Sequence, residues 1–84
     1  MSEAIRQVLK KLARLGVDVD TLTDDADLYS AGMTSHATVN VMLGLENAFD
    51  IEFPDHMLRR GVFESIFSIA TAIQSLPGSA RLAG

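Results

Sequence analysis

Three stretches of this sequence place apolar residues at the three- and four-residue steps of an α-helix. No stretch alternates apolar and polar residues as a half-buried strand would. The chain has 84 residues and no cysteine, so the fold depends on a small core shared by these helices and not on disulfides. The pattern predicts an all-α fold with three main helices.

The first helix is expected over residues 2 to 15, with Gly16 ending it, and the second from Thr34 or Ser35 to Phe49. The core face of the second helix is expected to comprise Thr38, Val41, Met42, Leu45, Ala48 and Phe49. Pro54 breaks the second pattern. A short helix is expected over residues 55 to 60 and a last one over residues 65 to 76. Residues 1–76 then make one domain, and residues 77–84 a flexible C-terminal tail.

A long acidic connection, residues 16 to 33, joins the first two helices. No Lys or Arg lies between residues 15 and 58, whereas nine of the eleven acidic residues do. This charge disfavours nucleic acid and favours a basic protein partner, although a solubilising loop would have the same composition. The aspartates do not follow the EF-hand spacing, so no metal site is expected.

The N-terminal segment carries spaced charges, and no apolar run is long enough to cross a bilayer. A soluble, cytoplasmic protein is expected. Catalysis is not, because Ser35 and His36 are neighbours that point about 100° apart on a helix. Nothing in the sequence places His56 near them, and no phosphate-binding glycine loop or metal-ligand cluster appears.

Ser35 at the start of the second helix has two interpretations. The free N–H groups and positive dipole of a first turn would hold a phosphate attached to this serine. Alternatively, Ser35 or Thr34 caps the helix. Ser35, Val39 and Leu43 follow one another at four-residue steps, so two apolar side chains line up with the serine on the polar side of the helix. They either form a docking strip for a partner or pack under a neighbouring short helix. The polar residues that flank this row are His36, Asn40, Glu46 and Asn47.

The segment "DLYSAGMTSH" followed by "LENAFDIEFPD" closely resembles the acyl and peptidyl carrier protein superfamily. That resemblance implies a small carrier-protein bundle in which a short helix III accompanies three main helices. It places a 4′-phosphopantetheine arm, derived from coenzyme A, on Ser35, with Gly32 on the family glycine. The reactive thiol then belongs to the arm, which accounts for the absence of cysteine. The sequence departs from the family motif at Thr34, where the family has aspartate, and at His36, where it has leucine.

The same segment looks most like free-standing bacterial aminoacyl carrier proteins. The resemblance implies an amino acid held as a thioester and loaded by a ligase similar to seryl-tRNA synthetases. It also implies a phosphopantetheinyl transferase, a downstream acceptor enzyme and a monomeric state. His36, Val39, Asn40, Leu43, Glu46 and Asn47 are the expected docking residues. Two alternatives remain: a discrete acyl carrier protein for polyketide, nonribosomal peptide or specialised lipid synthesis, and an unmodified helical interaction module.

Overall fold

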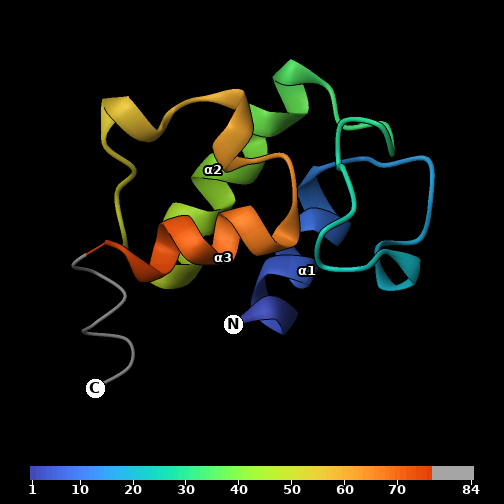
Figure 1. Cartoon of the computed structure of the whole chain (residues 1–84), viewed down its shortest axis with the longest axis horizontal. Helices are drawn as coiled ribbons and strands as arrows, with labels where there is room; N and C mark the ends of the chain where they lie inside the picture. The colour runs from blue at the N-terminus through green and yellow to red at the C-terminus, as the bar shows by residue number, and fades with distance from the viewer. Residues whose placement is uncertain (77–84) are drawn as a thin grey trace.

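The computed structural model describes residues 1–76, which form α-helices joined by loops that contain short 3₁₀ turns (Figure 1). In chain order the elements are α1 (Ser2–Leu12), η1 (Val19–Thr21), α2 (Ser35–Phe49), η2 (Asp55–Met57), η3 (Arg60–Val62) and α3 (Ile66–Gln74). No strand occurs within residues 1–76, which confirms the expected all-α fold. The tail expected at 77–84 lies outside the described residues.

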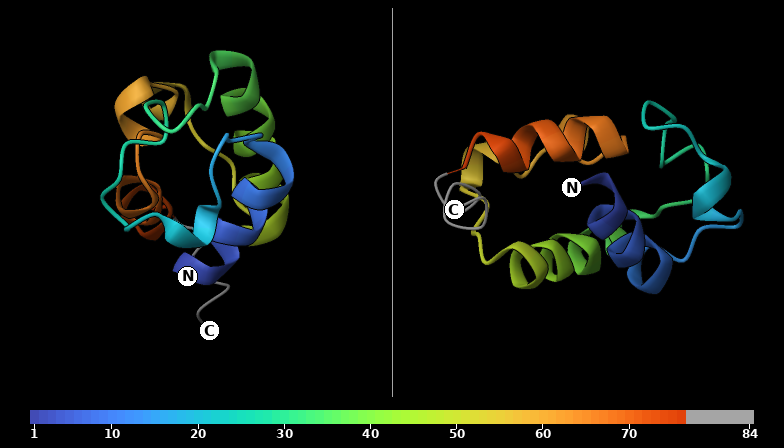
Figure 2. Two further views of the ribbon diagram at one scale, coloured as in Figure 1. Left: turned by 90° about the vertical axis from the view of Figure 1, so that its right-hand side faces the viewer. Right: turned by 90° about the horizontal axis from the view of Figure 1, so that it is seen from below.

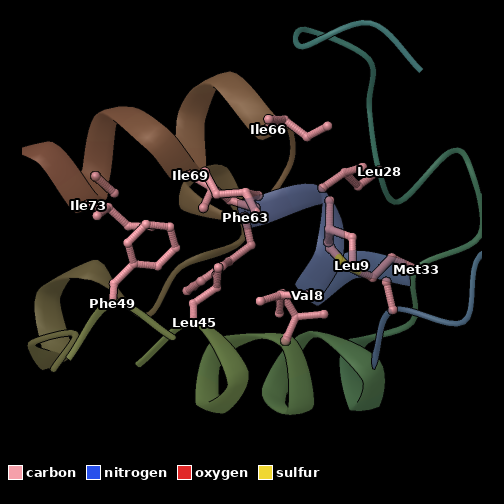
Figure 3. Packing of buried hydrophobic residues seen from close by; sticks show 14 of the residues in the cluster. Val8, Leu9, Leu28, Met33, Leu45, Phe49, Phe63, Ile66, Ile69 and Ile73 are labelled. Atoms are coloured by element: carbon pink, nitrogen blue, oxygen red, sulfur yellow. The ribbon is translucent and has the colours of Figure 1, made fainter. Parts of the chain in front are cut away.

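The three helices surround one core. α1 packs against both α2 and α3, and the right-hand view of Figure 2 shows α2 and α3 on opposite sides of the molecule. Leu45 and Phe49 of α2 point toward Ile69 and Ile73 of α3 in Figure 3, and Val8 of α1 lies beside them. Burying each large aliphatic side chain stabilises the fold by about 1.5–3 kcal/mol. The core therefore fixes α2, and with it the start of that helix.

α1 ends three residues earlier than the sequence predicts. Its last residue is Leu12, and Arg14 has a left-handed backbone with φ of 54°. A left-handed residue just after a helix ends it, usually at glycine. Here the turn occurs before Gly16, whose N–H then donates to the carbonyl of Ala31 across the loop at 3.4 Å.

The buried face of α2 differs slightly from the expected one. Its buried residues are Ala37, Val41, Leu45 and Phe49, which follow one another at four-residue steps. Ala48, expected in the core, is exposed. The helix is rotated so that Gly44 faces α1. A Cβ atom added at Gly44 would overlap Cδ1 of Leu12 and lie 3.0 Å from Cγ1 of Val8. The two helices approach closely because this position has no side chain.

The acidic connection is held by hydrogen bonds at several points. The guanidinium of Arg6 donates to the carbonyls of Val19 and Leu22 at 2.7 and 2.9 Å and to the carboxylate of Asp24 at 2.8 Å. Two main-chain bonds attach the connection to the segment around the start of α3. Leu28 N–H donates to the Glu64 carbonyl at 2.7 Å, and Phe67 N–H donates to the Asp24 carbonyl at 2.8 Å.

The single short helix expected over residues 55 to 60 is replaced by two 3₁₀ turns, η2 and η3. Leu58 and Arg59, between these turns, leave helical geometry, with ψ angles of 63° and 153°. The rings of Phe53 and Phe63 pack edge to face, with centroids 5.3 Å apart, and so anchor both ends of the segment. Within residues 1–76, no helix is long and apolar enough to span a membrane.

Candidate functional site

The first turn of α2 assigns different roles to two adjacent hydroxyl groups. Thr34 is the N-cap, and its Oγ1 accepts a hydrogen bond from Ala37 N–H at 3.0 Å. Ser35 is the first helical residue; it is exposed, and its hydroxyl makes no hydrogen bond to any described residue. Of the two caps that the sequence allowed, the structure therefore selects threonine. The serine hydroxyl is left free at the protein surface.

The backbone around Ser35 suits an anion. The first main-chain bond of α2 runs from Thr38 N–H to the Thr34 carbonyl, so the N–H groups of Ser35 and His36 precede the intrahelical ladder. Such groups, together with the helix dipole, stabilise a phosphate at a helix start. Thr34 contributes a cap without a negative charge, so nothing on this first turn repels an attached phosphodiester.

An open groove of about 330 Å³ begins at Ser35 and separates α2 from the segment that contains η3. Figure 1 shows the start of α2 and η3 both on the upper side of the molecule. The groove is lined by Tyr29, Ser35, Thr38, Val39, Met42, Leu58, Arg59, Arg60 and Phe63. Its volume is within the range of small-molecule sites. A group attached to Ser35 therefore has an apolar surface beside it.

Two arginines give this groove a positive edge. The guanidinium carbon of Arg60 lies 3.9 Å from the centre of the Tyr29 ring, a cation–π contact that holds its position. Within residues 1–76, neither Arg59 nor Arg60 lies within ion-pairing distance of a carboxylate. Arg59 and Arg60 were not among the functional residues predicted from the sequence. The sequence feature that could have identified them is that they are the only Lys or Arg residues between residues 15 and 80.

Asp27 is the carboxylate whose charge interacts with Arg60. Hydrogen bonds from the backbone N–H and hydroxyl of Ser30, and from the backbone N–H of Tyr29, lower the pKa of Asp27, and the charge of Arg60 adds to the effect. These bonds close the turn at residues 27–30. This turn places Tyr29 at the groove, where the tyrosine hydroxyl lies 3.4 Å from Thr38 Oγ1.

The expected docking residues lie along the outer face of α2. Val39 and Leu43 are 52% and 49% exposed, and they place apolar area on this outer face. His36, Asn40 and Asn47 are also exposed.

Glu46 differs from the other expected docking residues. It is half-buried, and its Oε2 accepts a hydrogen bond from Phe53 N–H at 2.9 Å. Its carboxylate holds the connection that leaves α2, in addition to any contact it makes with a partner.

The described residues hold no arrangement of catalytic groups around Ser35. His36 lies beside a separate hollow, lined also by Arg14, Thr34 and Asn40, while Ser35 faces the groove described above. His56, on η2, is exposed and does not line that groove. Within residues 1–76, no cluster of His, Cys, Asp or Glu side chains has the geometry of a metal site.

Residues 3–72 match the family model described as a phosphopantetheine attachment site. The chain is 50% identical over 74 residues to an aminoacyl carrier protein of Agrobacterium fabrum, an alignment that covers 88% of this chain and 89% of that protein. The residues around Ser35 fit the group that this family carries, because they combine a free hydroxyl, unpaired backbone N–H groups and an adjacent groove with a cationic edge.

Two solved structures extend this similarity to three dimensions. One is of an engineered Bradyrhizobium japonicum glycine:[carrier protein] ligase complexed with AMP and a carrier protein from Agrobacterium tumefaciens. The matched chain has a TM-score of 0.86 and 50% identity, with 88% of this chain and 99% of that chain covered. In the other, the Bradyrhizobium ligase is complexed with a glycylated carrier protein. The matched chain there has a TM-score of 0.73 and 30% identity, with 84% of this chain and 95% of that chain covered. With the fold, the site and the sequence in agreement, the chain belongs to the phosphopantetheine-binding carrier protein family and is a homologue of aminoacyl carrier proteins.

Proposed function

We propose that Ser35 is the attachment point of the 4′-phosphopantetheine arm and that the cargo is an amino acid. The observation that carries this proposal is that two adjacent hydroxyls at the start of α2 differ in their bonding. Thr34 caps the helix, and the exposed Ser35 hydroxyl is free to accept a phosphodiester. The thiol at the end of the arm supplies the chemistry, holding the cargo as a thioester. The protein itself supplies position and recognition and no catalysis.

Relatives support the choice of cargo. A protein 50% identical to this chain is named an aminoacyl carrier protein, and matching carriers occur in complexes with a glycine:[carrier protein] ligase, one of them glycylated. The loading enzyme proposed here is therefore an amino acid:carrier protein ligase. A phosphopantetheinyl transferase must act before it and an acceptor enzyme after it.

The outer face of α2 is the proposed contact surface for these enzymes. Val39 and Leu43 provide exposed apolar area in line with Ser35. His36, Asn40 and Asn47 add polar side chains without carboxylates, so the central part of this face carries little charge. Glu46 contributes at its edge while it also holds Phe53 in place.

The mass of the intact protein tests the attachment site. Wild type, Ser35→Ala and Thr34→Ala are incubated with coenzyme A and a broad-specificity phosphopantetheinyl transferase. We expect a gain of one arm in wild type and Thr34→Ala and no gain in Ser35→Ala. An arm on Ser35→Ala would overturn the assignment. No arm on wild type, here or in protein from its native host, would favour an unmodified interaction module.

Loading the modified protein tests the cargo. We expect an amino acid:carrier protein ligase, ATP and glycine or alanine to add one aminoacyl group, which neutral hydroxylamine then removes as expected of a thioester. Loading by an acyl ligase with a fatty or malonyl group, and by no amino acid ligase, would instead assign the protein to the discrete acyl carriers.

A further inference from the structure

We propose that the cationic groove beside Ser35 responds to the charge at the end of the arm. Arg59 and Arg60 allow an arm that ends in a thiol or a neutral acyl group to rest in the groove, and they repel one that ends in an α-ammonium group. The inference rests on the proposed attachment at Ser35. It adds a means by which loading changes where the end of the arm lies.

The apolar part of the groove provides the attraction. Val39 and Met42 come from α2, and Leu58 and Phe63 from the opposite segment, so apolar side chains form both walls next to Ser35. Val39 and Leu58 are 52% and 44% exposed and have apolar area left to cover. Methyl and methylene groups gain free energy when they cover such area. The arm begins with a charged phosphodiester at Ser35, but the part beyond it is uncharged, and its methyl and methylene groups meet this condition.

The two arginines distinguish a neutral arm from one that ends in a positive charge. Arg60 is held over the Tyr29 ring, and Arg59 lies next to it in the chain on the same groove. Asp27 offsets part of this charge, but its carboxylate oxygens accept bonds from Tyr29 and Ser30 and do not pair with either arginine. Each arginine therefore presents positive charge to whatever enters the groove.

An aminoacyl group adds one positive charge to the arm when it replaces the proton of the thiol, since its amino group is protonated at neutral pH. One like-charge contact at about 4 Å in water changes an equilibrium by roughly fivefold, and salt reduces the effect. Loading then shifts the arm out of the groove and leaves the thioester accessible to an acceptor. A neutral acyl group adds no charge and does not cause this shift.

The test compares full-length protein that carries three arms on Ser35, each confirmed by intact mass: the free thiol, an acetyl group and a glycyl group. Acetyl and glycyl are joined through an amide in place of the thioester, so neither hydrolyses. The readout is the ¹³C-methyl chemical shifts of Val39, Met42 and Leu58, with contacts from the arm to the Phe63 ring. We expect the acetyl and thiol arms to occupy the groove about fivefold more than the glycyl arm at low salt, and the difference to shrink at high salt.

Arg59→Gln and Arg60→Gln should each reduce the difference between acetyl and glycyl, and the double variant should remove it. Arg59→Gln keeps the Arg60–Tyr29 contact, so its effect does not depend on disturbing the groove. Lys10→Gln with Lys11→Gln is the matched control, because it removes two cations on α1 and should leave the difference intact. Equal occupancy by both arms, no occupancy by any arm, or a difference unchanged in the arginine variants would overturn the inference. If the arm is on Ser35 by mass, these outcomes leave the proposed function standing.

Discussion

Thr34 Oγ1 lies 3.0 Å from the backbone nitrogen of Ala37 and caps α2, while the neighbouring Ser35 hydroxyl remains unbonded within the described part of the chain. Of two adjacent hydroxyls, one caps the helix and the other is left available for the proposed attachment of the arm. In the carrier family the residue before the modified serine is an aspartate, as the resemblance implies. Threonine keeps the cap and leaves out the charge.

Stability should separate these two residues. Thr34→Ala removes the cap and is expected to lower the free energy of unfolding by about 1 kcal/mol. Ser35→Ala removes no hydrogen bond within residues 1–76 and should change it by less than about 0.5 kcal/mol. Urea unfolding followed by circular dichroism measures both. A larger loss in Ser35→Ala than in Thr34→Ala would mean that the serine is the cap in solution.

Docking on α2 should depend on its exposed apolar residues. Leu43→Ala and Val39→Asp are each expected to lower kcat/KM for loading by about five- to tenfold, the usual cost of truncating an important interface residue. Phe67→Ala is the control, because this residue is 65% exposed but lies on α3. The measurement is the initial rate of aminoacylation. Unchanged kinetics in both α2 variants, with the same unfolding curves, would remove this surface from the proposal.

A branched side chain at Gly44 should weaken the packing of α2 against α1. Gly44→Val is expected to cost about 1–3 kcal/mol, because its side chain would overlap Leu12 and crowd Val8 on α1. Helix propensity alone would predict that Gly44→Val stabilises the protein, since glycine is the poorer helix former. Gly16→Val is the comparison, because within residues 1–76 no atom outside its two chain neighbours lies within 4 Å of a Cβ added there. Thermal unfolding of the two variants should show a lower midpoint for Gly44→Val, and equal midpoints would contradict the close packing.

The turn at Asp27 should make stability depend on pH. Its pKa is lower in the folded protein than the ordinary 3.8, so the folded state binds fewer protons than the unfolded state between these values. The contribution is fully present above pH 3.8 and is lost as the pH falls through the lowered value. Asp27→Asn should therefore be less stable than wild type at pH 6, and the gap should narrow in acid.

Asp25→Asn is the matched control for the turn at Asp27. It removes the same charge from the same loop but keeps the bonds from Ser30 and Tyr29. Urea midpoints across the pH range measure the effect. A gap between Asp27→Asn and wild type that stays constant down to pH 2 would contradict the folded-state interaction.

The helices were predictable because each needs only its own local period of apolar residues. The ends of the helices were harder to predict. The left-handed turn at Arg14 depends on where Gly16 bonds to Ala31 across the loop, which no local pattern shows. Residues 55 to 60 contain no helix breaker after Pro54, so local sequence favoured one helix. Packing of Phe63 against Phe53 divides it into two turns.

The position of Ser35 could be predicted from sequence, but its surroundings could not. The groove joins Tyr29 to Arg60, which are about thirty residues apart, and no local pattern links them. The choice between Thr34 and Ser35 as cap was also undecidable, since either hydroxyl can accept from the first turn. Only the register of the helix, fixed by its packing against α1, selects threonine.

The acidic connection is attached to the segment around α3 through main-chain atoms, Leu28 N–H to the Glu64 carbonyl and Phe67 N–H to the Asp24 carbonyl. Such bonds require no particular side chain at either end. Positions of the connection whose side chains make no hydrogen bond of their own, unlike Asp24 and Asp27, can therefore change while its path stays the same. A lineage, or a protein engineer, can change the charge at these positions without rebuilding the scaffold.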